Sequence, residues 1–248
     1  MKIYLASQPY HLKYLIKNKT PYVLISFYYF RDKKIQEEWR PYFSQFKDVI
    51  IDSGAFSMMR DKKKAVDLDK YVEDYIKFVK KYHFKHYIEL DIDSVIGYDR
   101  VKQYREKLEN GIGWKSIPVW HINRGKEGWL ELVEDYDYIA MGGFLTDGIK
   151  TKEYGLLDWF LHTAKKKNVK VHALGYTNTK SLKRVPFYSV DSSTWALGGV
   201  WKFVCKFEKN HIQRYNFEMR KPKLSNAQLD DFNCQEWTKF AYWAEAHL

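Results

Sequence analysis

The stretch FYSVDSSTW at residues 187–195 is a run of strand-forming residues that ends at an acid. Residues up to Val190 favour extended backbone, whereas the Ser and Thr residues after Asp191 favour a loop. The stretch VIIDSGAFS at residues 49–57 repeats this pattern, with an apolar run that ends at Asp52. A set of such acids at one end of a sheet would form an active site.

Short apolar segments alternate with amphipathic segments along the whole chain. One helix face is predicted between the third and fourth strands, because apolar residues there recur at the spacing of a helix turn. Eight βα units in 248 residues predict an α/β fold, a (β/α)8 TIM barrel that forms a single domain over residues 1–248. The eight strands are expected at residues 3–6, 22–26, 49–51, 87–90, 117–121, 138–141, 169–174 and 187–190.

Two further elements are predicted beyond the barrel, an extra strand at residues 201–207 and a C-terminal helix. Ser225 and Gln228 have the spacing of a capping box, so they mark the start of that helix. Within the barrel, Gly111 is expected to end the helix that follows the fourth strand.

Composition restricts the class of protein. Lys and Arg number 42 against 31 Asp and Glu, which gives a formal charge of +11, and 18% of residues are aromatic. These values favour a nucleic-acid partner, although a basic surface also serves solubility and most rings belong in a core. The chain has no apolar run long enough for a membrane span and no segment typical of a signal peptide. Two cysteines without a C-x-x-C pair favour a cytoplasmic location.

Polar side chains or glycines follow six of the predicted strands. In a TIM barrel these positions meet at one rim, where the chemistry takes place. The rim is therefore expected to carry Asp52, Glu89, Asp91, Asp93, His121, Asn123, Arg124, Gly142, Gly143, Gly175 and Asp191.

Other interpretations of these residues stay open. Asp52 and Asp191 could cap helices, and Asp91 with Asp93 could bind a divalent metal. His121 could be a hydrogen-bonded core residue. The two glycines of AMGGF could form a tight turn, or could let a planar ligand approach their N–H groups.

A pair of strand-end carboxylates suits chemistry at an acetal-like carbon. One carboxylate attacks the anomeric carbon, and the other moves the proton. An ordinary glycoside hydrolase would need neither the high positive charge nor the paired glycines of the rim.

Four motifs resemble the tRNA-guanine transglycosylase (queuine tRNA-ribosyltransferase-like) superfamily: DSGAF at 52–56, AMGGF at 140–144, HALGYT at 172–177 and SVDSSTW at 189–195. The resemblance is closest to the short phage-encoded branch of DNA 7-deazaguanine transglycosylases. It implies a TIM-barrel pentosyltransferase that exchanges guanine in nucleic acid for a 7-deazaguanine base.

The resemblance also implies roles for residues. Asp191 would attack C1′ and form a covalent aspartyl-nucleotide, and Asp52 would be the general acid/base. Asp91 or Asp93 would bind the guanine-like edge of the base, with Asn123 or His121 beside it. Backbone groups would complete the pocket at Gly142, Gly143 and Gly175.

The family's zinc cluster is missing here, so no metal and no cofactor are expected. Its loss and the shorter chain favour DNA over tRNA as the substrate, in the cytoplasm of a host if the protein is phage-encoded. The alternatives are the same exchange on tRNA and a non-catalytic nucleic-acid-binding barrel. Phosphate contacts are expected from Arg60, Lys62, Lys63, Lys64, Arg124 and Lys126.

Overall fold

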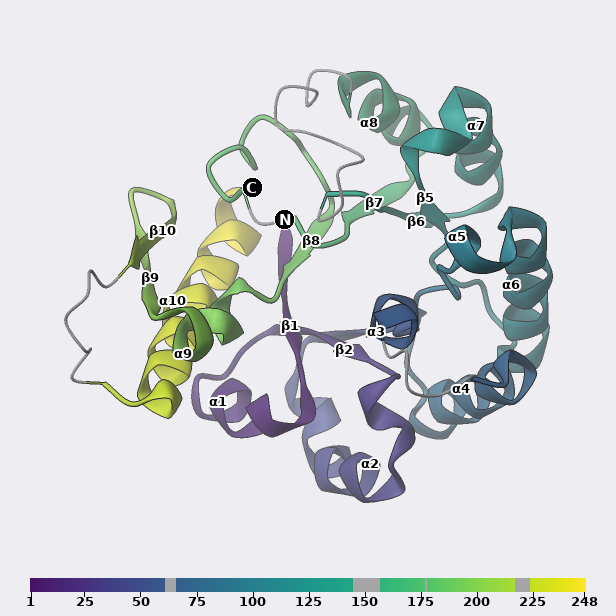
Figure 1. The fold of residues 1–248 in the computed structure, drawn as a ribbon. Coiled ribbons are helices and arrows are strands. Elements are labelled where there is room, and N and C mark those ends of the chain that lie inside the picture. The colour runs from purple at the N-terminus through teal and green to yellow at the C-terminus, as the bar shows by residue number, and fades with distance from the viewer. Residues whose placement is uncertain (61–65, 145–156, 177, 217–223) are drawn as a thin grey trace.

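Eight short parallel strands form the centre of the protein (Figure 1). The computed structural model describes residues 1–60, 66–144, 157–176, 178–216 and 224–248. The strands pair in the order β4-β3-β2-β1-β8-β7-β6-β5, and a parallel bridge between Ile88 and Ile117 joins β4 to β5. The predicted α/β TIM barrel is therefore confirmed. The strands are β1 Lys2–Ser7, β2 Tyr22–Ser26, β3 Asp48–Asp52, β4 His86–Tyr87, β5 Val119–Trp120, β6 Tyr138–Met141, β7 Lys170–Ala173 and β8 Ser189–Ser192.

Helices surround this barrel in the view of Figure 1. One predicted helix is missing: the described residues 178–185 after β7 form turns and bends, so the seventh unit is not a complete βα unit. None of the described helices is long and apolar enough to cross a membrane. The helices are α1 Leu12–Lys17, α2 Lys33–Trp39, α3 Ala55–Arg60, α4 Leu68–Tyr82, α5 Asp93–Ile96, α6 Tyr98–Ile112, α7 Gly125–Asp135, α8 Leu157–Lys166, α9 Gly198–Trp201 and α10 Asn226–His247.

Local signals in the sequence account for the helix ends. The Asp67 side chain accepts a hydrogen bond from the Lys70 N–H and so caps the start of α4. The predicted end of α6 at Gly111 is wrong, because the helix continues to Ile112 and Gly113 takes the left-handed conformation, with φ at 101°. A Cβ on Gly111 would lie 2.7 Å from Ile76 Cδ1, so this glycine instead lets α6 approach α4 closely.

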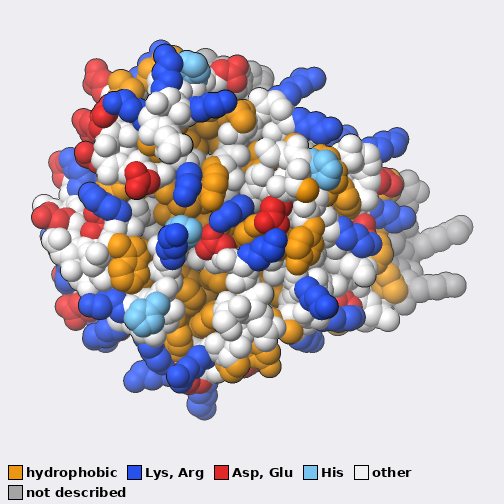
Figure 2. Space-filling view, turned by 180° about the vertical axis from the view of Figure 1, so that it is seen from behind, with side chains coloured by type: hydrophobic (Ala, Val, Ile, Leu, Met, Phe, Trp, Pro, Cys, Tyr) orange, Lys and Arg blue, Asp and Glu red, His pale blue; other side chains and the backbone are white. Residues whose placement is uncertain are grey.

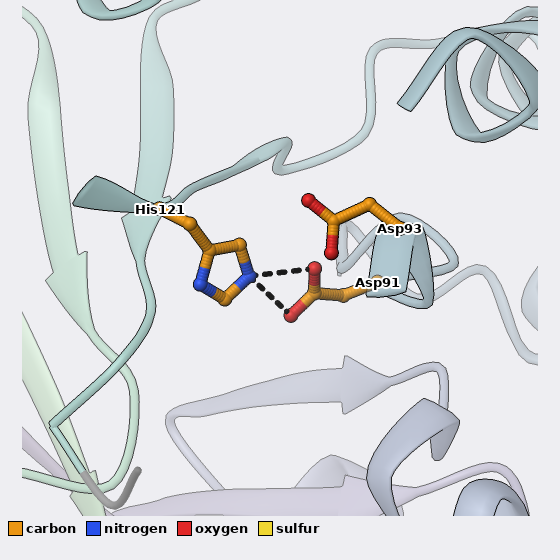
Figure 3. Close-up of side chains that lie close together, drawn as sticks. All are labelled: Asp91, Asp93 and His121. Atoms are coloured by element: carbon orange, nitrogen blue, oxygen red, sulfur yellow. Dashed lines mark hydrogen bonds and ion pairs between the residues drawn. The ribbon is translucent and has the colours of Figure 1, made fainter. Parts of the chain in front are cut away.

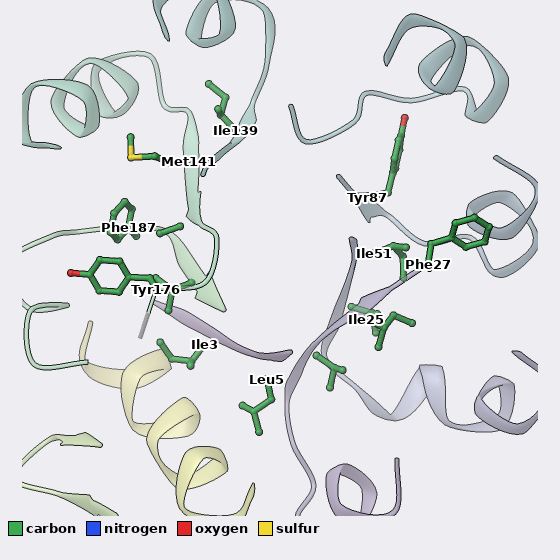
Figure 4. Close-up of a cluster of buried hydrophobic side chains, with 14 of the residues drawn as sticks. Ile3, Leu5, Ile25, Phe27, Ile51, Tyr87, Ile139, Met141, Tyr176 and Phe187 are labelled. Atoms are coloured by element: carbon green, nitrogen blue, oxygen red, sulfur yellow. The ribbon is translucent and has the colours of Figure 1, made fainter. Parts of the chain in front are cut away.

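Alternate strand residues point to two different layers, as the period of a strand requires. Outward-facing residues such as Leu5, Ile25 and Ile51 pack between the strands and the helices (Figure 4). A smaller cluster that includes Tyr4 and Tyr138 forms a second buried layer from the alternate strand positions. Each fully buried apolar side chain contributes about 1.5–3 kcal/mol, so these two layers supply most of the stabilisation.

A hairpin and a long helix follow the barrel. The predicted extra strand is present as β9 (Phe203–Glu208), and it pairs with an antiparallel strand, β10 (His211–Asn216), that the sequence analysis did not predict. The predicted capping box of Ser225 and Gln228 starts α10 and is confirmed. In Figure 1, α10 lies beside β1 and the hairpin, and the Met1 ammonium donates to the Ala244 carbonyl at 3.1 Å, which ties both ends of the chain together.

A charged cluster closes the amino-terminal end of β3, far along the strand from Asp52. Asp48 accepts hydrogen bonds from Lys2 Nζ at 2.9 Å and from the Tyr4 hydroxyl at 2.8 Å, and it lies 2.9 Å from His86 Nδ1. Burial by itself would raise the pKa of Asp48, but the bonds and charges of His86, Lys2 and Tyr4 outweigh it and hold this pKa below its usual value.

Because its pKa is lower in the folded protein, Asp48 stabilises the fold above its unfolded pKa of about 4 and loses this effect as pH falls through the folded value. We expect Asp48→Asn to lower the free energy of unfolding by roughly 2–3 kcal/mol at pH 7, and by less at pH 3. Urea unfolding at both pH values measures this difference. The control Asp99→Asn changes an exposed acid and should have a far smaller effect at either pH. An equal effect of Asp48→Asn at both pH values would contradict the account.

Candidate active site

A cavity of about 790 Å³ opens at the carboxyl ends of the barrel strands. Its lining comes from the ends of β1 to β8 and the loops that follow them, which is where TIM barrels carry their chemistry. The structure brings together all nine residues predicted for catalysis and substrate binding, since each of them lines this cavity: Asp52, Asp91, Asp93, His121, Asn123, Gly142, Gly143, Gly175 and Asp191.

Asp191 is a buried carboxylate at the carboxyl-terminal part of β8. Its Oδ1 accepts a hydrogen bond from the Gly175 N–H at 2.8 Å and lies 3.2 Å from His172 Nε2. Both contacts are made by the same oxygen, which leaves Oδ2 without a partner among the described residues. The contacts therefore fix the orientation of the carboxyl through Oδ1.

Asp52, at the end of β3, is in a different environment. One side of its carboxyl faces the cavity, and protein encloses the rest. Burial and the negative charge of Asp191 raise the pKa of Asp52 to about 7, against the lowering effects of the Gly54 N–H and the Ser26 hydroxyl. At neutral pH, therefore, a large share of Asp52 carries a proton.

The turn after Asp52 requires glycine. Gly54 has a φ of 80°, and a Cβ at this position would lie 2.5 Å from Tyr28 Cβ. The bare backbone lets the Gly54 N–H reach back to Asp52 Oδ2 at 3.1 Å. The local backbone structure therefore explains why the DSGAF motif has a glycine at this position, without reference to any ligand.

A second group of charged side chains lies on the β4 and β5 side of the cavity (Figure 3). His121 Nε2 lies 2.8 Å and 3.0 Å from the two oxygens of Asp91, and Arg124 bonds Asp93 at 2.8 Å. Asp91, Asp93 and His121 could together offer three ligand atoms to a metal ion. The guanidinium of Arg124, itself 3.9 Å from Asp91, already supplies a positive charge there, so the geometry disfavours the divalent-metal interpretation.

His121 keeps one nitrogen available to a ligand. Burial lowers the pKa of His121, but the hydrogen bond and charge of Asp91 outweigh it, so the pKa is raised overall. Nδ1 points away from Asp91 in Figure 3, and no described residue accepts a hydrogen bond from it. Because Nε2 is held by Asp91, Nδ1 is the nitrogen that can meet a substrate oxygen.

The Gly142 N–H is not available to a ligand, because it donates to the Trp120 carbonyl at 2.9 Å within the sheet. The glycine instead makes room for His121, since a Cβ on Gly142 would lie 2.5 Å from His121 Cε1. Gly143, with φ at 97°, turns the chain after β6, and the Gly175 N–H serves Asp191.

We expect Gly142→Ala to displace the His121 ring and to lower its pKa, because the bond to Asp91 would lengthen. An NMR titration of His121 measures this shift. The matched control is Gly128→Ala on α7, where the added Cβ would come no closer than 3.1 Å to a side-chain carbon of Arg124. An unchanged titration of His121 in Gly142→Ala would contradict this role of the glycine.

The predicted phosphate contacts have mixed outcomes. Lys62, Lys63 and Lys64 lie outside the described residues, as does the side chain of Arg60. Arg124 is only 5% exposed in its ion pairs, so it does not project to the surface. Lys126 is exposed beside the Trp159 ring. On the face shown in Figure 2, Lys and Arg side chains are interspersed with acidic ones instead of forming one stripe. The nucleic-acid partner stays a prediction.

Sequence reasoning missed two residues that shape the site. His172 is fully buried on β7 and contacts Asp191, and its place two residues before the predicted strand end at Leu174 was the available signal. His11 lines the cavity after β1, and burial lowers its pKa to about 4. A histidine after the first strand was visible in the sequence, but nothing there distinguished it from a surface residue.

Comparisons with known proteins support the fold only. No family model matches the chain, and no curated protein matches it. One similar solved structure is a crystal structure from Coccidioides immitis, provisionally assigned as a fructose-1,6-biphosphate aldolase; it is 9% identical, has a TM-score of 0.56, and the match covers 99% of this chain and 88% of that one. Another is described as a native KDPGal structure, with 10% identity, a TM-score of 0.47 and coverage of 99% and 95%.

The predicted membership of the transglycosylase superfamily is contradicted, because no family model matches and the Coccidioides immitis barrel is provisionally assigned as an aldolase. The guanine exchange, the glycosyltransferase class and the DNA modification that rested on it were therefore wrong. The physical reason lies in the motifs. Gly54 and Gly142 are needed because a Cβ at either position would clash with a neighbouring residue, and Gly175 donates its N–H to Asp191. Acids at strand ends are common to many TIM-barrel enzymes.

Proposed function

We propose that the protein is a carbon–carbon lyase of the retro-aldol type that acts on a small uncharged hydroxycarbonyl compound. One observation carries the proposal: the carboxyls of Asp52 and Asp191 line the same cavity, where burial and the negative charge of Asp191 raise the pKa of Asp52 to about 7. A carboxyl that keeps its proton near neutral pH beside a second carboxyl is suited to be the acid of an acid–base pair.

The two carboxyls suit the two proton transfers of aldol cleavage. Asp191 Oδ2 takes the proton from the substrate hydroxyl, and the C–O bond becomes a carbonyl as the adjacent C–C bond breaks. The electron pair of the broken C–C bond moves toward the second carbonyl group of the substrate. The oxygen of that carbonyl takes the Asp52 proton, and this fragment is released as an enol. His121 Nδ1 is placed to hydrogen-bond the same oxygen as its charge develops.

Among the described residues that line the cavity there is no lysine, so we assign activation of the carbonyl to hydrogen bonds instead of an imine. Four aspartates line the cavity, and Arg124 is engaged with two of them. Such a lining disfavours phosphate or carboxylate groups on the substrate. The barrel shared with an aldolase-assigned protein is compatible with this proposal and supports only the fold. A cytoplasmic location is part of the proposal, supported by the buried free thiols of Cys205 and Cys234.

The test is a panel of uncharged β-hydroxy ketones and aldehydes, each paired with its phosphorylated counterpart, with release of the carbonyl products followed from pH 5 to 9. We expect cleavage of uncharged compounds and a decline in kcat above pH 7, because Asp52 then loses the proton it must donate. Asp52→Asn should lower kcat by about 10²–10³-fold and remove this decline. Cleavage of glycosides in place of carbonyl compounds, or of phosphorylated compounds alone, would contradict the proposal.

A further inference from the structure

A line of hydrogen-bonded side chains runs from the cavity into the barrel, behind Asp191. Asp191 Oδ1 lies 3.2 Å from His172 Nε2, His172 Nδ1 lies 2.7 Å from Ser189 Oγ, and Ser189 Oγ lies 2.6 Å from the Tyr138 hydroxyl. The line therefore connects three neighbouring strands, β8, β7 and β6.

These side chains are closed off from solvent. His172 and Ser189 are fully buried, and Tyr138 is 7% exposed. The Tyr4 ring packs edge-on against His172 at 5.8 Å between centroids. Because His172 and Ser189 have no contact with solvent, the arrangement of the hydrogens on them is set by their protein partners.

The hydrogen-bonding capacity of each group determines which atom donates in every hydrogen bond of this line. A carboxylate only accepts, so His172 Nε2 carries the hydrogen that points to Asp191. In a neutral imidazole the other nitrogen is then an acceptor, and it takes the hydrogen of the Ser189 hydroxyl. The Ser189 oxygen in turn accepts the hydrogen of the Tyr138 hydroxyl.

We propose that His172 is a positioning residue for Asp191, held as the neutral Nε2–H tautomer by Ser189 and Tyr138. The catalytic part rests on the proposed function, in which Asp191 is the base. With Oδ1 engaged by Gly175 and His172, the orientation of the carboxylate is set and Oδ2 is left for the substrate.

Loss of Ser189 would remove the hydrogen that fixes His172. The tautomer with hydrogen on Nδ1 would then place the Nε2 lone pair against the Asp191 carboxylate, and the Gly175 N–H would be left to orient the carboxylate without His172. We expect Ser189→Ala to lower kcat by roughly 10-fold with KM unchanged, because the substrate does not touch Ser189.

Side-chain ¹⁵N NMR of the substrate-free protein tests the tautomer directly, with His172→Gln used to assign the His172 signals. The neutral Nε2–H form is expected in the wild type, and a mixture of forms in Ser189→Ala. Ser192→Ala is the matched control: it removes another fully buried hydroxyl of β8, which accepts from the Thr194 N–H and, among the described residues, does not bond His172. It should change neither the His172 signals nor kcat.

A doubly protonated or Nδ1–H His172 in the wild type would overturn the inference, as would unchanged His172 signals in Ser189→Ala. A protein that cleaves no compound of the panel would overturn the proposed function alone, because the tautomer measurement needs no substrate. A cleaving enzyme in which Ser189→Ala alters the tautomer but not kcat would overturn the positioning role.

Discussion

Asp191→Asn lowers kcat for carbon–carbon cleavage by about 10³-fold or more, because an amide cannot take the proton of the substrate hydroxyl. The hydrogen bond from Gly175 can still reach the amide oxygen, so the backbone around β8 keeps its geometry. Steady-state kinetics on the best compound of the panel measures the loss, and KM should change far less than kcat.

The control for this variant is Asp230→Asn on α10. Asp230 also accepts a glycine N–H, from Gly199 at 3.1 Å, but it does not line the cavity. Its replacement should leave kcat within about two-fold of the wild type. Equal losses in both variants would attribute the effect of Asp191→Asn to general destabilisation, and a wild-type rate in Asp191→Asn would show that Asp191 is not the base.

The largest effect on stability is expected from Arg105→Leu. Arg105 Nε bonds Glu89 Oε2 at 2.6 Å, Glu89 is fully buried, and the Arg105 side chain is 8% exposed. Removal of the guanidinium leaves a buried carboxylate without its nearest countercharge, at a cost of about 3–5 kcal/mol. Urea unfolding at pH 7 measures this change.

Two further variants test the cause. Arg100→Leu, on the exposed part of the same helix, should cost less than about 1 kcal/mol. Adding Glu89→Gln to Arg105→Leu should recover part of the loss, because Gln removes the buried charge and can still accept the Val119 N–H that Glu89 binds at 2.7 Å. A double variant no more stable than Arg105→Leu would contradict the electrostatic explanation.

The strand positions were predictable because buried parallel strands are continuous apolar runs. β2 and β6 match their predicted limits, and β1 and β3 extend each prediction by one or two residues. β4 and β5 are shorter than predicted, and beyond them the backbone pairing continues as the bridge between Ile88 and Ile117. The β10 strand was missed because most of its residues are polar and none is buried, so no apolar alternation marks it.

The membership of the cavity could also be predicted, since strand-end positions converge in any parallel barrel. The chemistry of each residue could not. Asp52 and Asp191 are equivalent in the sequence, and only the structure shows that burial and the charge of Asp191 raise the pKa of Asp52, and that His172 contacts Asp191. Arg124, predicted to contact phosphate, is instead the countercharge of Asp93, because η4 (Ile122–Arg124) turns it inward.

The proton distribution between Asp52 and Asp191 is the centre of this account, and ¹³C NMR of aspartate-labelled protein measures it most directly. The signal of Asp52, identified by its absence in Asp52→Asn, is expected to titrate near pH 7 in the wild type. In Asp191→Asn the midpoint should fall, because the neighbouring negative charge is gone. An Asp52 carboxyl that titrates near pH 4 in the wild type would contradict the account.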